Sequence, residues 1–343
     1  MKKRFAIFLL LFLGILLVGQ GQTIFAQETN AKIQAEDDLK AKCSSDADCS
    51  RPGMLGVCQA PGEKTARCVW QEVIKVPAIV IEPEACRSCQ ANVIVDQLRT
   101  LFSGLEVEYL KTNDKKARDL IQEFKIKMLP AYILEKDVER EPGFANFQKM
   151  ATLTNGKYYL NPERSGVSFF VDRKLEKDKL DLFLVLTSPG MYQSAKIAQE
   201  IAANKKANVA VNIHFLGIED PQSKKIVSPG EDREISEDTI YACVEKYYPS
   251  EALGYLTDRI LNISDIWLED YLAAHKLDAK KIKGCALSQE GQKLFMDKIR
   301  LSQELNVRYA PLFLMENNEI FGASEKTTAD EIIKIMKSQN ATK

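Results

Sequence analysis

One segment of the chain joins a predicted strand, a cysteine pair and a predicted helix: residues 76–102 read VPAIVIEPEACRSCQANVIVDQLRTLF. Apolar residues dominate positions 76–81, as is typical of a buried strand, and a Glu-Pro-Glu triplet ends it. A helical pattern follows the cysteines, with one apolar face formed by Val93, Ile94, Leu98, Leu101 and Phe102. We therefore expect Cys86 and Cys89 on the first turn of a helix, directly after a strand.

This position favours redox chemistry at Cys86 and Cys89. The free N–H groups and the positive dipole end of a helix N-terminus stabilise a thiolate. In a Cys-x-x-Cys motif the pKa of the first thiol can fall from about 8.5 to roughly 3.5–7.5. Arg87 adds a positive charge beside Cys86, and we expect Arg87 and Ser88 to tune the thiol. Cys86 and Cys89 are the candidate catalytic residues.

Other readings of the cysteine pair are a metal site, a haem site and a structural disulfide. A zinc site needs two more ligands, but the sequence has no second Cys-x-x-Cys, and His214 and His275 are distant in sequence. A c-type haem needs histidine where Gln90 stands. We therefore expect no metal and no cofactor, and a plain structural disulfide remains the main alternative.

Residues 72–172 resemble a thioredoxin-like domain. Besides the cysteines, the resemblance rests on residues 128–134, MLPAYIL, and on a helix, a strand (105–110) and a helix (115–124) between the two motifs. In this superfamily a proline, usually after a cis peptide bond, opens a strand opposite the cysteines.

The resemblance implies a role for the Leu129-Pro130 pair in substrate binding. Pro130 would shape the surface that holds the substrate chain against Cys86, where it lacks an N–H that would compete. The family often buries an acid on the strand before the cysteines. Here that strand is apolar, and Glu82 and Glu84 are the nearest acids.

A second copy of this layout begins after a charged linker at residues 173–179. Residues 180–339 repeat the strand, helix, strand and X-Pro-strand order, with Pro311 as the proline. A helical insertion at about 217–305 resembles the DsbA-type disulfide oxidoreductases. Ser188 stands where those proteins place the attacking cysteine, so by resemblance this domain has lost its Cys-x-x-Cys. We expect an inactive scaffold.

The N-terminus predicts export from the cytoplasm. Residues 1–26 have a Lys-Lys-Arg start, an apolar run and an acceptable cleavage site, which together are typical of a secretory signal peptide. An uncleaved anchor is the alternative, although the apolar run is shorter than the about 20 residues that span a bilayer. Residues 27–42 then form a polar leader. We expect a periplasmic or secreted protein, in a compartment where disulfides persist.

The other six of the eight cysteines are expected in structural disulfides. Residues 43–70 are too few for a core and predict a stapled module, with two disulfides in any of three connectivities among Cys43, Cys49, Cys58 and Cys68. Cys243 and Cys285 lie early and late in the helical insertion, where they are expected to form a structural disulfide or, as the alternative, a relay pair that exchanges with Cys86 and Cys89. A disulfide between them would close a loop of about 40 residues and contribute about 2–4 kcal/mol.

The sequence thus predicts an α/β protein with two thioredoxin-like domains. The predicted activity is extracytoplasmic protein thiol–disulfide oxidoreduction through a mixed disulfide, and oxidase, isomerase and reductase share this framework. The alternative is a binding or assembly protein, either a chaperone or a Cu(I) carrier. Expected partners are proteins with thiols or disulfides and a membrane redox recycling partner. The net charge of −1 argues against nucleic acid.

Overall fold

The computed structural model describes residues 43–51, 54–188, 190–220, 222–223, 225–264 and 267–338. These residues belong to two compact units, which meet between Val73 and Ile74 in the sequence. The predicted signal peptide and leader lie outside the described residues. Within the described ranges, no helix has both the length and the apolar character needed to cross a membrane.

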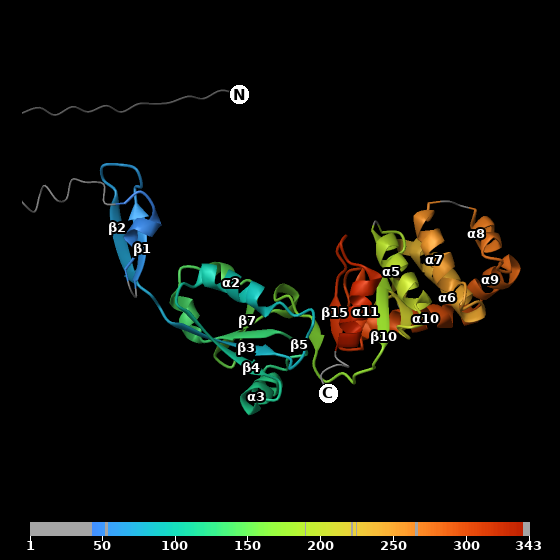
Figure 1. Cartoon of the computed structure of the whole chain (residues 1–343), viewed down its shortest axis with the longest axis horizontal. Helices are drawn as coiled ribbons and strands as arrows, with labels where there is room; N and C mark the ends of the chain where they lie inside the picture. The colour runs from blue at the N-terminus through green and yellow to red at the C-terminus, as the bar shows by residue number, and fades with distance from the viewer. Residues whose placement is uncertain are drawn as a thin grey trace, which may run out of the picture. The chain divides into compact units, whose positions relative to one another are not determined.

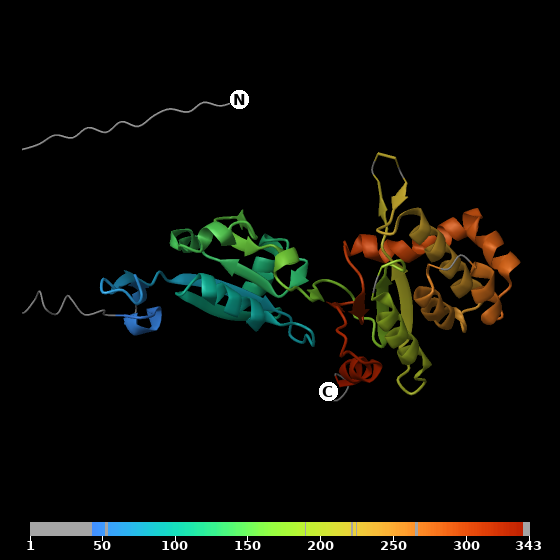
Figure 2. The ribbon, with the colours of Figure 1, turned by 90° about the horizontal axis from the view of Figure 1, so that it is seen from above.

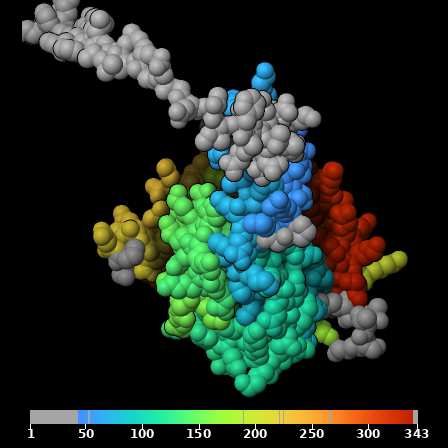
Figure 3. Space-filling view, turned by 90° about the vertical axis from the view of Figure 1, so that its left-hand side faces the viewer, coloured from blue at the N-terminus to red at the C-terminus, as the bar shows by residue number. Residues whose placement is uncertain are grey.

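The N-terminal unit is a small disulfide-bonded module, coloured blue in the space-filling view (Figure 3). Cys43 pairs with Cys58 and Cys49 with Cys68, which is one of the three connectivities open to the sequence. Apart from Ala66, the buried apolar residues of this unit are cysteines, because so short a segment has no other core. Its elements are η1 (Asp46–Cys49) and the antiparallel strands β1 (Met54–Gln59) and β2 (Arg67–Glu72).

The second unit contains a five-stranded mixed sheet, in the order β4-β3-β6-β8-β7. Strands β3 and β4 are parallel, and the other neighbours are antiparallel. The strands are β3 (Val76–Glu82), β4 (Leu105–Lys111), β6 (Ala131–Leu134), β7 (Ala151–Thr154) and β8 (Lys157–Leu160).

Side chains of β3 alternate between the two faces of this sheet, as a strand period of two requires. Val76, Ala78 and Val80 pack with helix α2 (Ala91–Leu101) on one face. Ile79 and Ile81 pack with helix α3 (Lys115–Glu123) on the other. Figure 1 shows the two helices on opposite sides of the sheet. The strand is buried on both faces, which explains its continuous apolar sequence.

The connections of this sheet follow the local sequence signal at one turn and depart from it at one helix. Asn155 and Gly156, with φ values of 49° and 79°, form the tight turn between β7 and β8 that Asn-Gly predicts. The sequence of residues 144–153 has a helical pattern, but the helix ends at Phe147, because residues 151–154 pair with β8. The remaining short elements are β5 (Met128–Leu129), η2 (Lys136–Arg140), α4 (Phe144–Phe147), η3 (Pro162–Arg164) and β9 (Phe169–Phe170).

A second mixed sheet has the order β11-β10-β14-β15-β9-β5. Its first four strands repeat the pattern of β4-β3-β6-β8, with one parallel pair followed by antiparallel neighbours. The last two strands come from residues 128–170, so this sheet also includes the strand that precedes Pro130. The four repeating strands are β10 (Lys179–Leu184), β11 (Ala210–Phe215), β14 (Leu312–Met315) and β15 (Glu319–Phe321).

Helices cover the second sheet and form the segment predicted as a helical insertion. Cys243 in α6 and Cys285 in α9 form a disulfide. A small hairpin, β12 (Ile218–Glu219) and β13 (Ile226–Val227), was not expected from the sequence and projects beyond the helices in Figure 2. The helices are α5 (Met191–Ala203), α6 (Glu231–Tyr247), α7 (Ala252–Leu261), α8 (Leu268–Ala274), α9 (Ala279–Ala286), α10 (Gln289–Glu304) and α11 (Ala329–Ser338).

The mixed α/β architecture, with two mixed sheets that share one strand pattern, confirms the predicted α/β fold class. Both X-Pro bonds singled out in the sequence, Leu129-Pro130 and Ala310-Pro311, are cis. Thr328 and Glu331 form a capping box at the start of α11, since the Thr328 N–H donates to the Glu331 carboxylate and the Glu331 N–H donates to the Thr328 hydroxyl.

Candidate redox site

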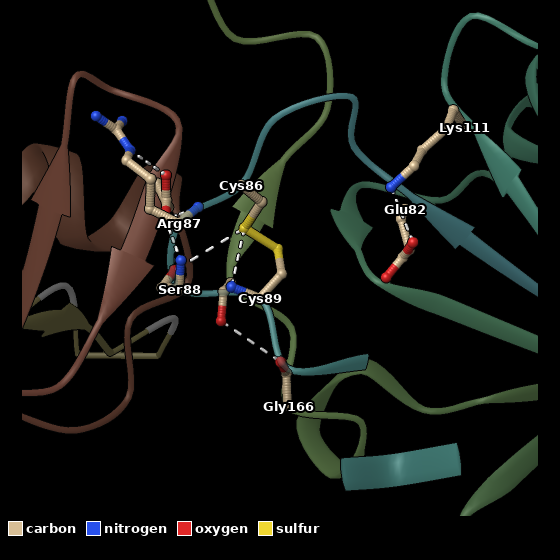
Figure 4. Close-up of a disulfide and its surroundings, with 9 residues drawn as sticks. Glu82, Cys86, Arg87, Ser88, Cys89, Lys111 and Gly166 are labelled. Atoms are coloured by element: carbon tan, nitrogen blue, oxygen red, sulfur yellow. Dashed lines mark hydrogen bonds and ion pairs between the residues drawn. A yellow bond between two sulfur atoms is a disulfide. The ribbon is translucent and has the colours of Figure 1, made fainter. Parts of the chain in front are cut away.

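Cys86 and Cys89 form a disulfide in the loop between β3 and α2 (Figure 4). Both residues are half-buried. The prediction that they lie on the first helical turn is wrong, because α2 begins at Ala91 after an N-cap at Gln90. The Cys89 N–H donates to Cys86 Sγ at 3.0 Å, within the loop itself.

The two N–H groups between the cysteines bind a carboxylate from a distant part of the chain. Glu319 Oε1 accepts the Arg87 N–H at 2.7 Å and the Ser88 N–H at 2.5 Å. Glu319 opens β15 and is 1% exposed. These donors therefore face a fixed negative charge instead of being free for a thiolate.

The positive charge of the Arg87 side chain is also balanced by two carboxylates. Its Nε donates to Glu319 Oε2 at 3.1 Å, and its terminal NH2 group donates to Glu316 Oε2 at 3.0 Å. The remaining amino group donates to the Ile335 carbonyl of α11 at 3.4 Å. The three charged side chains are 14%, 1% and 6% exposed for Arg87, Glu319 and Glu316, so solvent screens them little.

Sequence reasoning did not identify Glu319 or Glu316 as site residues. Glu319 is separated from Arg87 by 232 positions, and its strand β15 pairs with both β14 and β9. The sequence signal that could have identified Glu319 is its position as an acidic residue at the start of a short strand, directly after Asn317-Asn318.

Ser88 lies beside the disulfide, and the residues that precede the cis-proline are fixed within the second sheet. Ser88 Oγ is 4.0 Å from Cys86 Sγ. Leu129 and Pro130 are both buried. The Leu129 carbonyl accepts the Ser168 N–H at 2.8 Å, as part of the pairing of β5 with β9. The backbone at Leu129 is therefore already used within the sheet.

An open depression of about 350 Å³ lies next to Cys86 and Cys89. Glu82, at the end of β3, lines it and pairs with Lys111 at 2.9 Å (Figure 4). Glu82 is thus the acid from the preceding strand that shares a surface with the sulfur atoms. The rest of the lining is formed by Pro83, Glu84, Ala85, Arg87, Lys111 and Ser338.

The corresponding turn of the second sheet also holds a carboxylate on its backbone. Glu234 of α6 accepts the N–H groups of Leu186 and Thr187, which follow β10. Asp238, one helical turn further on, is fully buried. Burial first, and then the charge of Glu234, raise the pKa of Asp238 well above its usual range.

The raised pKa of Asp238 predicts a pH-dependent stability. The unfolded chain loses this proton near the ordinary Asp pKa of 3.8, whereas the folded chain keeps it to higher pH. The free energy of unfolding should therefore fall as pH rises through that window. In Asp238→Asn the group carries no proton to lose, so the decline should be smaller in urea unfolding between about pH 4 and about pH 8.

Asp270→Asn is the matched control, because it removes one carboxylate at an exposed position. It should keep the wild-type slope. Equal slopes for wild type and Asp238→Asn would contradict the assignment of the proton to Asp238.

Comparison with solved structures gives matches that cover about half of this chain. The oxidoreductase NmDsbA1 from N. meningitidis is 12% identical, with a TM-score of 0.36 over 50% of this chain and 90% of its own. The thiol-disulfide exchange protein alpha-DsbA2 from Wolbachia pipientis is 11% identical, with a TM-score of 0.37 over 47% and 81%. Proteus mirabilis ScsC in a transitional conformation is 19% identical, with a TM-score of 0.35 over 50% and 69%.

No family model and no curated protein matches the chain. The structural matches have low identity and low TM-scores, so we draw no conclusion about activity from them.

Proposed function

We propose that the protein is an extracytoplasmic thiol–disulfide oxidoreductase that acts through Cys86 and Cys89. The observation that supports this proposal most is the placement of the pair. The disulfide is half-buried in the loop between β3 and α2, and both cysteines line an open depression. By comparison, Cys243 and Cys285 are 0% and 6% exposed within a helical core. A redox-active sulfur must be reachable by a second sulfur, and this pair meets that requirement.

The proposed reaction passes through a mixed disulfide. In the reducing direction, the Cys86 thiolate attacks one sulfur of a substrate disulfide, forms a bond to it and releases the other sulfur as a thiolate. The Cys89 thiolate then attacks Cys86 Sγ, closes the Cys86–Cys89 disulfide and releases the second substrate sulfur as a thiolate. Two electrons pass from the protein to the substrate, and the reverse sequence oxidises a substrate dithiol.

The neighbouring residues have supporting roles in this proposal. Arg87 and Ser88 tune the thiol, and Pro130 shapes the surface beside it. Because the Leu129 carbonyl is held by Ser168, we propose that the substrate approaches mainly through the depression next to Cys86. Glu82 lines that depression and is the candidate to exchange a proton with Cys89.

The proposed partners follow from this chemistry. They are exported proteins that carry thiols or disulfides, and a membrane redox protein that resets the pair. Residues 180–339 are proposed as a scaffold without redox activity of their own. Ser188 lies in the turn after β10, the first strand of this segment, and serine has no redox couple.

Differential alkylation tests the proposal against a structural role for the pair. After gentle reduction, we expect Cys86 to react with iodoacetamide at about pH 8, because its half-buried sulfur lines the open depression. Mass spectrometry of peptides identifies the modified residue. Cys243 and Cys285 are an internal control and should stay oxidised. If the Cys86–Cys89 disulfide resists reduction as they do, the binding-protein alternative is favoured.

A further inference from the structure

Glu319 contacts the cysteine loop at the backbone of the two residues between the redox cysteines. One carboxylate oxygen binds two consecutive N–H groups, and both belong to the residues between the redox cysteines. Backbone N–H groups at this position are among those that can stabilise a thiolate on Cys86, and of the three N–H groups that follow Cys86 the Cys89 N–H is the one that donates to its sulfur.

The charges around the loop add to this effect. Arg87 contributes one positive charge, while Glu316 and Glu319 contribute two negative charges. These side chains are largely buried, where charge interactions are stronger than in water. The cluster as a whole therefore carries an excess negative charge next to Cys86, which disfavours a second anion there.

We propose that Glu319 is a positioning residue that sets the reduction potential of the Cys86–Cys89 pair. This inference rests on the proposed function. Glu319 holds the loop through two N–H groups, and its charge destabilises the reduced form, in which Cys86 is a thiolate. Residues 180–338 lack a Cys-x-x-Cys motif, yet through Glu319 they would make the reduction potential of the Cys86–Cys89 pair more negative.

The relevant equilibrium is the exchange with glutathione. The Cys86–Cys89 disulfide and two molecules of reduced glutathione give the two protein thiols and one molecule of oxidised glutathione. A group that stabilises the Cys86 thiolate shifts this equilibrium toward the reduced protein, which makes the potential less negative.

Glu319→Gln is the variant that separates charge from position. The amide keeps an oxygen that can accept the Arg87 and Ser88 N–H groups, but it removes the negative charge. We expect the equilibrium constant for reduction by glutathione to rise about tenfold, which corresponds to about 30 mV for this two-electron couple. Thiol trapping across a series of glutathione ratios measures the midpoint.

Two further variants make the test specific. Glu269→Gln removes the same charge from an exposed ion pair with Lys283, between helices α8 and α9, and should keep the wild-type midpoint. Arg87→Gln removes the positive charge that offsets Glu319, so its midpoint should move in the opposite direction, toward the oxidised protein. Arg87→Gln also keeps the proposal testable if Glu319→Gln does not fold, as judged by circular dichroism.

The outcomes distinguish this inference from the proposed function. If the wild type has no measurable midpoint, the proposed function fails. If the wild type titrates reversibly but Glu319→Gln and Arg87→Gln share its midpoint, the role of Glu319 is wrong while the proposed function stands. Opposite shifts in the two variants, with Glu269→Gln unchanged, support the role.

Discussion

The Cys86→Ser variant is expected to reduce a test disulfide no faster than the uncatalysed exchange of small thiols. The hydroxyl of serine does not ionise near neutral pH and cannot form the mixed disulfide.

In Cys89→Ser the first attack still occurs, but no second thiol is present to release the substrate. This variant should accumulate a covalent complex that a reductant dissolves, visible on non-reducing gels.

The two serine variants control for each other, because each removes the same disulfide from the loop. A purely structural bond would make both variants behave alike. Exchange at the wild-type rate in Cys86→Ser, or trapping by Cys86→Ser instead of Cys89→Ser, would contradict the proposed mechanism.

The Arg259→Met variant should lose about 3–5 kcal/mol of folding free energy, as expected when one partner of a buried ion pair is removed. Arg259 donates to both carboxylate oxygens of Glu237, at 2.9 Å and 2.5 Å. Its side chain and that of Glu237 are only 4% and 10% exposed. Methionine fills similar space but leaves the Glu237 charge buried without its partner. Urea unfolding followed by circular dichroism measures the loss.

The double variant Glu237→Leu with Arg259→Met isolates the cause of that loss. It removes both charges, so most of the lost stability should return. A double variant as unstable as Arg259→Met would show that the packing of Arg259, including its position over the ring of Tyr271 at 5.2 Å, matters more than the ion pair.

Local sequence signals predicted the parts of the fold that depend on neighbouring residues. The apolar run of β3 is buried on both faces, and its continuity indicated this. Asn155-Gly156 predicted a hairpin because both residues accept a left-handed conformation. The cis-prolines could be expected only from the resemblance to thioredoxin-like domains, since periodicity does not indicate a peptide-bond isomer.

Tertiary contacts explain what the sequence did not predict. The first turn of α2 was placed too early, because Arg87 and Ser88 give their N–H groups to Glu319 rather than to a cap of their own segment. That acceptor follows 232 residues later, and a single sequence contains no signal that links the two positions.

Two other differences have similar causes. Residues 151–153 satisfy a helical pattern but gain sheet hydrogen bonds from β8, which override local propensity. Helix α9 lies in the predicted helical insertion, but its lysine-rich sequence has few apolar positions, so periodicity alone does not give its bounds. Its disulfide to Cys243 and its N-cap, where Asp278 accepts the Lys281 N–H, fix it in place.

The reduction potential of the Cys86–Cys89 pair tests the central claim most directly. The protein is equilibrated with a series of glutathione ratios, and its thiols are trapped and counted by mass. A redox-active pair predicts a reversible midpoint between about −120 and −270 mV, the range of known thiol–disulfide oxidoreductases. A pair that stays oxidised below about −300 mV behaves as a structural disulfide, and that result would contradict the proposed function.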